Sequence, residues 1–235
     1  MNNFCKIFKE KKFVLISSLP ENNPELAKAA VNSGTDVLKV HINVVHHASG
    51  TAFGSLAEEK TNLEKIISVT RNAGVPVGIV PGAKPGIGPC ELNPLVGMGF
   101  DFFSIYAAHL SPTGLDLKEI GKMVALDSSY HPYETKFLAK MGVDACEASV
   151  IPGNGYGYPL SVQDLLKYQC IVQEFNGAVI VPTQRVIKPT DLSPLIRTGV
   201  RGLMIGAVVA GKEVSEFEKS VRSYRKAIEK YENNV

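Results

Sequence analysis

One pattern recurs along the chain: a helix-like segment ends at a glycine, and a short run rich in Val, Ile and Leu follows within a few residues. Glycine just beyond a helix end adopts the left-handed conformation that other residues avoid, so each repeat predicts a helix-to-strand junction. With two further apolar runs, the predicted strands lie at residues 13–17, 36–42, 75–80, 100–106, 123–127, 144–151, 178–183 and 201–205.

These runs are almost continuously apolar, which is typical of parallel strands covered by helices on both faces. Helical patterns between them cover residues 24–32, 63–72 and 162–175, whereas Pro and Gly interrupt the segments after the third and fourth strands. Eight strand–helix units in 235 residues predict a single α/β domain over residues 1–235, a closed (β/α)8 TIM barrel. An open doubly wound sheet is the alternative, but it wants a glycine-rich turn after the first strand, and residues 17–21 have none.

Composition narrows the function classes. The formal charge of +2 has mixed signs, and no basic stripe alternates with aromatic residues, so we expect no nucleic-acid partner. The apolar runs are too short to cross a membrane. The start of the chain lacks the pattern of a secretory signal, and four cysteines without metal or redox spacing are typical of reduced thiols. We therefore expect a cytoplasmic protein without a cofactor, and one that is compatible with a homo-oligomer.

The active site of such a barrel lies at the carboxyl ends of its strands. In the second strand, side chains alternate so that Lys39, His41 and Asn43 share the face that points into the barrel. A buried lysine is costly unless it is paired or functional. Lys39 is therefore either part of a structural ion pair or a catalytic group. Asn43 is a candidate substrate contact.

The sixth strand supplies a partner for this lysine. Glu147 and Ser149 share its inward face, and the second and sixth strands are opposite each other in a ring of eight. A Lys and a Glu on either side of a substrate can remove a proton and return it, as epimerisation or isomerisation of a sugar requires. Asp127, at the end of the fifth strand, is a third candidate base, or it caps the helix that follows.

Two glycine-containing segments predict an anion site. Residues 199–209 form a helix stop, a short strand and then Gly206-Ala207, where the backbone can approach a ligand and a helix start attracts negative charge. Residues 149–159 contain three glycines and two tyrosines, which indicates a loop that covers a ligand, although an ordinary glycine-rich connection has a similar composition. The barrel is therefore predicted to be of the phosphate-binding type.

Several segments resemble the ribulose-phosphate-binding barrel superfamily, and most of all its pentulose-phosphate 3-epimerases and N-acylmannosamine-phosphate 2-epimerases. Residues 149–155 are similar to the phosphate loop of the former, residues 41–47 to their second strand, and residues 205–208 to their last strand. Residues 24–36 are similar to the first helix of the acylmannosamine-phosphate enzymes. The resemblance implies a small phosphorylated substrate.

The chain departs from the metal-dependent epimerases at their ligands. Asn43 occupies the position of one metal-binding Asp, and an amide is a poor ligand for a divalent transition metal. The third strand lacks the Asp-x-His of the family, and the seventh ends Val181-Pro-Thr-Gln-Arg185 rather than in Asp-Gly-Gly. We therefore expect no metal, and we expect His46 and His47 to be loop or substrate contacts.

What the resemblance implies is a phosphate site made by backbone groups of Gly155, Gly157, Thr183, Gln184, Gly206 and Ala207. Arg185 and Lys188 follow the seventh strand closely enough to add positive charge, unless they are solvated loop cations.

Three functions remain open at this stage. The first is a metal-independent isomerase or epimerase of a phosphorylated sugar or a related small phosphometabolite, with Lys39, Glu147, Asp127 and His41 as catalytic candidates. The second is a lyase, aldolase or synthase, in which Lys39 forms a Schiff base. The third is a barrel that binds a phosphorylated metabolite without converting it, with Lys39 and Glu147 as a structural pair.

Overall fold

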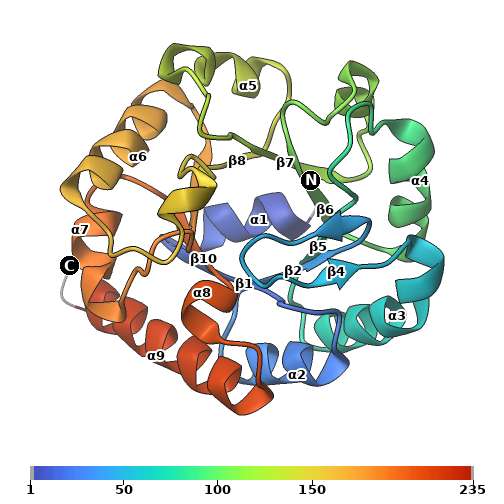
Figure 1. The fold of residues 1–235 in the computed structure, drawn as a ribbon, viewed down its shortest axis with the longest axis horizontal. Helices are drawn as coiled ribbons and strands as arrows, with labels where there is room; N and C mark the ends of the chain where they lie inside the picture. Colours follow the sequence, from blue (N-terminus) through green and yellow to red (C-terminus); the bar gives the residue numbers. More distant parts are fainter. Residues whose placement is uncertain (1–2, 234–235) are drawn as a thin grey trace.

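The computed structural model describes residues 3–233, and its centre is a closed barrel of eight parallel strands (Figure 1). The strands close in the order β1-β10-β9-β8-β7-β6-β5-β2, which confirms the (β/α)8 barrel and excludes the open sheet. Their bounds are β1 Val14–Ser18, β2 Val37–His41, β5 Val77–Val80, β6 Phe102–Tyr106, β7 Gly121–Ala125, β8 Ala145–Glu147, β9 Ala178–Pro182 and β10 Gly202–Ile205.

The predicted strands match these positions, but the sixth is shorter than expected. Pairing of β8 stops at Glu147, because the chain folds back on itself there and the Ser149 amide donates to the Glu147 carbonyl at 2.9 Å. The Ile151 amide then donates to the Gln184 side chain at 3.1 Å instead of to a neighbouring strand. Residues 148–151 are therefore a buried connection that leads out of the barrel.

Helices surround the barrel on its outer face (Figure 1). Their bounds are α2 Pro24–Asn32, α3 Leu56–Asn72, α4 Pro89–Met98, α5 Lys136–Lys140, α6 Val162–Glu174, α7 Leu192–Ile196, α8 Ala207–Ala210 and α9 Val214–Glu232, with 3₁₀ turns η1 Pro112–Asp116, η2 Pro132–Glu134, η3 Gly153–Gly155 and η4 Pro189–Asp191.

Local capping explains where several of these helices begin. Helix α2 has the predicted bounds, whereas α3 starts seven residues earlier than predicted because Ser55 and Glu58 form a capping box. A second capping box at Ser161 and Asp164 starts α6. The segment between β6 and β7, where Pro and Gly interrupt the pattern, contains η1 in place of an α-helix.

Two apolar layers hold the barrel together. The outer layer lies between the strands and the helices, and the inner one fills the lower half of the barrel with residues such as Ile16, Phe102 and Met123. Gly78 leaves room for this filling, because a Cβ there would lie 2.2 Å from the Phe102 ring. Side chains therefore fill the barrel from its amino end up to the cavity at its carboxyl end.

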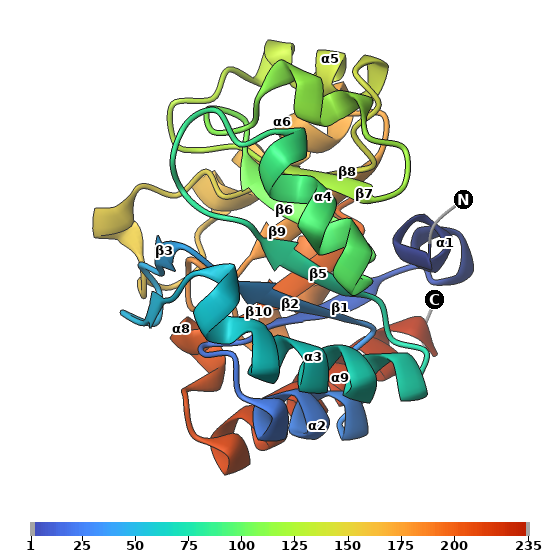
Figure 2. The ribbon, with the colours of Figure 1, turned by 90° about the vertical axis from the view of Figure 1, so that its right-hand side faces the viewer.

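Helix α1, Asn3–Glu10, closes the amino end of the barrel and was not predicted from the sequence. Phe4 is fully buried and stacks on Phe102 with ring centroids 3.9 Å apart. At the opposite end, a hairpin of β3 Val44–Val45 and β4 Ala52–Phe53, also unpredicted, extends β2. Figure 2 shows α1 and β3 at opposite ends of the molecule. Among residues 3–233, no helix combines the length and the apolarity that crossing a membrane requires.

Candidate active site

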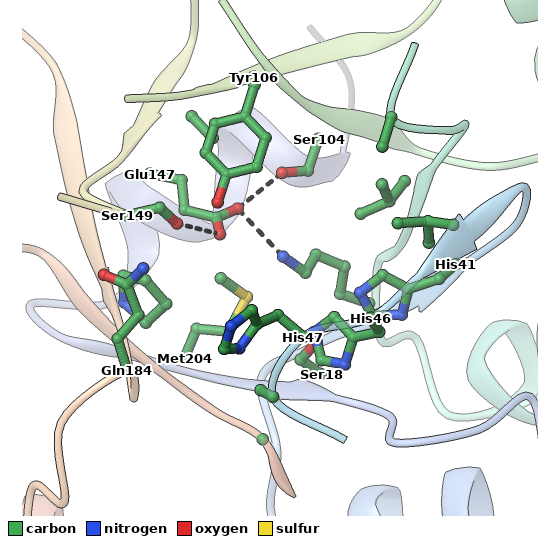
Figure 3. Close-up of a pocket in the computed structure, with 18 of the residues that line it drawn as sticks. Ser18, His41, His46, His47, Ser104, Tyr106, Glu147, Ser149, Gln184 and Met204 are labelled. Atoms are coloured by element: carbon green, nitrogen blue, oxygen red, sulfur yellow. Dashed lines mark hydrogen bonds and ion pairs between the residues drawn. The ribbon is translucent and has the colours of Figure 1, made fainter. Parts of the chain in front are cut away.

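A cavity of about 240 Å³ opens at the carboxyl end of the barrel, between the β3–β4 hairpin and the loop that contains η3. Its floor is an ion pair across the barrel: the Lys39 ammonium lies 3.0 Å from Oε2 of Glu147 (Figure 3). Both side chains are buried, with 5% and 6% of their residue surface exposed. The alternation of side chains along β2 and β8 thus brings together the two residues that the sequence pairs, while their roles stay predictions.

Two serines complete the surroundings of Glu147. The Ser104 hydroxyl donates to Oε2 at 2.7 Å, and the Ser149 hydroxyl donates to Oε1 at 2.9 Å. Burial raises the pKa of Glu147, but the Lys39 charge and the three donated hydrogen bonds outweigh it, so the pKa lies below its ordinary value. The carboxylate is therefore ionised at neutral pH although it is shielded from water.

Asp127 is not brought to this cavity. Its carboxylate accepts hydrogen bonds from the Ser129 amide at 2.8 Å and from the Ser129 hydroxyl. These contacts lower its pKa and hold it in the turn after β7. Asp127 therefore stabilises the turn at residues 127–129 and does not cap a helix, since the next helical element, η2, begins only at Pro132.

His41 and His46 are neutral aromatic walls of the cavity. Burial, together with His46 and Lys39, lowers the pKa of His41 well below its ordinary value. Burial and Lys39 lower the pKa of His46 to about 4. The two ring centroids lie 4.6 Å apart, and Nδ1 of His41 is buried without a hydrogen-bond partner among the described residues. A neutral imidazole beside a cationic lysine can donate a hydrogen bond to a developing oxyanion.

Asn43 does not share the inward face of Lys39 and His41, so the predicted orientation is wrong. Strand β2 ends at His41, and Asn43 adopts a positive φ of 54°, which turns its side chain away. Its amide donates to the Pro81 carbonyl at 3.1 Å. Asn22 fixes the strand end instead, because its side-chain amide donates to the His41 carbonyl at 2.7 Å.

Tyr106 and Tyr156 also line the cavity. Tyr156 belongs to the loop that the sequence predicts to cover a ligand, whereas Tyr106 was not among the predicted residues. Tyr106 follows Phe102 and Ser104 on the inward face of β6, so strand alternation alone could have identified it. Tyr156 lies in an irregular loop, and its signal was the composition of residues 149–159. Its hydroxyl accepts a hydrogen bond from Gln184 at 2.6 Å, and its ring lies 4.7 Å from that of His47. The two loops at the mouth therefore touch each other over the cavity.

The glycine-rich loop does not present the amides that the resemblance implies. The Gly155 amide donates to the Pro152 carbonyl at 2.8 Å, and the Gly157 amide donates to the Gln184 carbonyl at 2.9 Å. Neither glycine lines the cavity. Their hydrogen bonds stabilise the loop, and the predicted role of these two amides in binding phosphate is unsupported by this geometry.

The two cations after β9 are also placed differently from the expectation. Arg185 forms two hydrogen bonds with Asp164, at 3.0 and 3.2 Å, and a third with the Gly155 carbonyl at 2.7 Å. It therefore joins the mouth loop to α6 rather than adding free charge to the cavity. Lys188 is exposed at the start of η4, outside the cavity.

Of the remaining predicted anion residues, three line the cavity and Ala207 does not. Thr183, Gln184 and Gly206 line it, and the Gly206 amide donates to the Thr183 hydroxyl oxygen at 3.1 Å. The next two amides, those of Ala207 and Val208 in the first turn of α8, have no hydrogen-bond partner among residues 3–233. This turn is the part of the predicted phosphate site that retains free donors.

Within residues 3–233, no three His, Cys, Asp or Glu side chains are grouped closely enough to hold a metal ion.

A closed ring of eight parallel strands with a cavity at their carboxyl ends defines the protein as a (β/α)8 TIM barrel. No protein-family model and no curated protein sequence matches the chain. Solved structures do match it, and they confirm the (β/α)8 barrel expected from the sequence as the fold.

Three of these solved structures cover nearly the whole chain. Thiamine phosphate pyrophosphorylase from Pyrococcus furiosus matches at 14% identity and a TM-score of 0.66, over 93% of this chain and 96% of its own. KGPDC from Streptococcus mutans matches at 11% identity and a TM-score of 0.67, over 94% of this chain and 99% of its own. Phosphoribosyl anthranilate isomerase from Thermus thermophilus matches at 13% identity and a TM-score of 0.64, over 93% of this chain and 100% of its own. At these identities, what is shared is the fold.

Proposed function

We propose that the protein is an isomerase or epimerase that moves a proton on a small phosphorylated sugar or related phosphometabolite. The observation that carries the proposal is the Lys39–Glu147 pair on the cavity floor. A carboxylate that is ionised at neutral pH can accept a proton from carbon, and the positive charge fixed beside it can stabilise the negative charge that results.

The reaction needs a substrate with a carbonyl group next to a C–H bond. Glu147 takes the proton from that carbon, the C–H electrons form a C=C bond, and the carbonyl oxygen becomes an oxyanion. Lys39 stabilises the oxyanion, and the neutral His41 ring is a second donor. Isomerisation requires a hydroxyl group on the deprotonated carbon: the proton returns to the former carbonyl carbon, the hydroxyl proton moves to the oxyanion, and the hydroxyl oxygen becomes the new carbonyl oxygen. Return of the proton to the other face of the original carbon instead inverts that carbon. Atoms and charge balance in both outcomes.

The first turn of α8 is the proposed position of the phosphate group. Its support is the pair of free amides at Ala207 and Val208, next to the cavity residues Thr183 and Gly206. Barrels that share this fold include two whose names contain a phosphorylated compound, thiamine phosphate in one and a phosphoribosyl group in the other. With the phosphate at this turn, the rest of the substrate extends over the active site at the strand ends.

A Schiff-base lyase is the second candidate, because Lys39 is a buried amine that lines the cavity. Its contact with Glu147 favours proton transfer, since a charged ammonium has no lone pair with which to attack a carbonyl. A binding protein without turnover is the third candidate.

Two measurements separate these candidates. Incubation in D₂O with a panel of aldose and ketose phosphates and of phosphorylated hydroxyketones with alkyl or aryl ends is expected to place deuterium on the carbon next to the carbonyl of at least one member. Glu147→Gln is expected to abolish the exchange. Borohydride reduction in the presence of the same panel is expected to leave Lys39 unmodified by mass spectrometry. An adduct on Lys39 would establish the lyase, and the lack of both exchange and adduct across the panel would leave only binding.

A further inference from the structure

The cavity has two chemically different sides. In the closed strand order β9 and β5 lie opposite each other, and the axis between them crosses the β2–β8 axis on which Lys39 and Glu147 meet. The side at β9 and β10 carries Thr183, Gln184 and Gly206. A substrate whose phosphate lies on that side must extend over the ion pair toward β5.

The side at β5 is apolar. Val80 points into the cavity because Val77 and Ile79 pack in the outer layer, and it is followed by Gly82 and Ala83. Val44 of the hairpin adds a further apolar wall. Among the described residues, the loop and strand at β5 contribute no polar side chain to the cavity.

The polar side chains nearest to this apolar side come from the two neighbouring strands, Lys39 and His41 on β2 and Ser104 and Tyr106 on β6. The Ser104 hydroxyl on β6 is already donated to Glu147. His41 and His46 are neutral rings, and His41 also packs 4.8 Å from the Phe53 ring. A hydroxyl group placed against Val80, Gly82 and Ala83 would exchange its hydrogen bonds to water for contact with carbon.

We infer that the substrate end remote from the phosphate is apolar, an alkyl or aryl group, and not a polyhydroxyl chain. The inference rests on the proposed function for the position of the phosphate. The volume agrees, since an apolar cavity of about 150 Å³ holds benzene, and the 240 Å³ here holds a group of that size together with the reacting carbons. Val80 is the residue that sets this preference.

The experiment compares two ligands with the same five-carbon chain and terminal phosphate. The Kd values of n-pentyl phosphate and ribitol 5-phosphate are measured by calorimetry at constant ionic strength, with inorganic phosphate as competitor. Pentyl phosphate is expected to bind about tenfold tighter. Val80→Thr introduces a hydroxyl group with little change in side-chain volume. In this variant, the ratio of the ribitol 5-phosphate Kd to the pentyl phosphate Kd is expected to fall severalfold. Val162→Thr, on the exposed surface of α6, is the control and leaves both values unchanged.

The outcomes separate the inference from the proposed function. If inorganic phosphate displaces both ligands and ribitol 5-phosphate binds as tightly or more tightly, the apolar side is wrong while the phosphate site stands. The inference is also overturned if Val80→Thr leaves the ratio of the two Kd values unchanged. If phosphate displaces neither ligand, the phosphate site and the proposed function fail together with it.

Discussion

The Ser104 hydroxyl donates a hydrogen bond of 2.7 Å to Oε2 of Glu147, the same oxygen that faces the Lys39 ammonium. Ser104 lies on β6 and Glu147 on β8, so this bond spans two strands of the barrel. It stabilises the ionised carboxylate and contributes to the low pKa of Glu147.

Ser104→Ala is therefore expected to raise the pKa of Glu147. The base is then protonated at a higher pH, so the acid limb of the pH dependence of deuterium exchange moves to higher pH, with little change at alkaline pH. The measurement is the exchange rate as a function of pH. Ser128→Ala, at an exposed position in the turn after β7, is the control. An unshifted acid limb would show that Glu147 is not the base.

The buried ion pair makes an unusual stability prediction. Lys39→Met leaves the Glu147 carboxylate buried without its partner and is expected to cost about 3–5 kcal/mol of unfolding free energy. The double variant Lys39→Met, Glu147→Leu removes both charges and is expected to regain most of that loss. Urea unfolding measures both values. Exchange activity is lost in both variants if the pair is catalytic, whereas a purely structural pair predicts that activity returns with stability.

The Arg185–Asp164 pair predicts a pH-dependent stability. Burial raises the pKa of Asp164, but the hydrogen bonds from Ser161 and Arg185 lower it below the ordinary value. The stability that the carboxylate contributes is therefore complete above the ordinary aspartate pKa and is lost as pH falls through the lower folded-state pKa.

Asp164→Asn is accordingly expected to be less stable than the wild type at neutral pH, with a difference that narrows by about pH 3. Urea midpoints at the two pH values test this. Glu218→Gln removes an exposed pair with Arg222 and is expected to have a negligible effect at either pH. A difference between wild type and Asp164→Asn that does not narrow on acidification would contradict the assignment.

The contact between Phe4 and Phe102 predicts that α1 is part of the barrel core. Phe4→Ala opens a cavity under the barrel floor and is expected to cost about 3–5 kcal/mol. Phe8→Ala, on the same helix at a partly exposed position, is expected to cost clearly less. Equal effects of the two substitutions on the free energy of unfolding would contradict the role of α1 as a plug.

The barrel was predictable because its signals are local. Glycines such as Gly34 and Gly199 do adopt the positive φ that ends a helix, and the apolar runs after them are the strands. The facing of Lys39 and Glu147 was predictable for the same reason, since the side-chain period along a strand is two residues. The early start of α3 also has a local signal, the Ser55–Glu58 capping box.

Asn43 and Arg185 show where this reasoning stops. The period of two holds only while the strand continues, and β2 ends two residues before Asn43. Arg185 follows β9 closely in the sequence, which predicts a position near the cavity. In the structure it pairs instead with Asp164, which lies on α6, 21 residues earlier in the chain. Where a strand ends and which partner a loop cation finds depend on contacts that no short-range pattern contains.

The sequence by itself therefore determined the barrel, the order of its elements and the Lys39–Glu147 axis. The tertiary structure decided what surrounds that axis: the plug of α1, the meeting of Tyr156 with His47, and the division of the cavity into a polar and an apolar side. The physical reason is that helix and strand periods follow from neighbouring residues. The composition of a cavity follows instead from loops whose conformations are set by hydrogen bonds between distant segments.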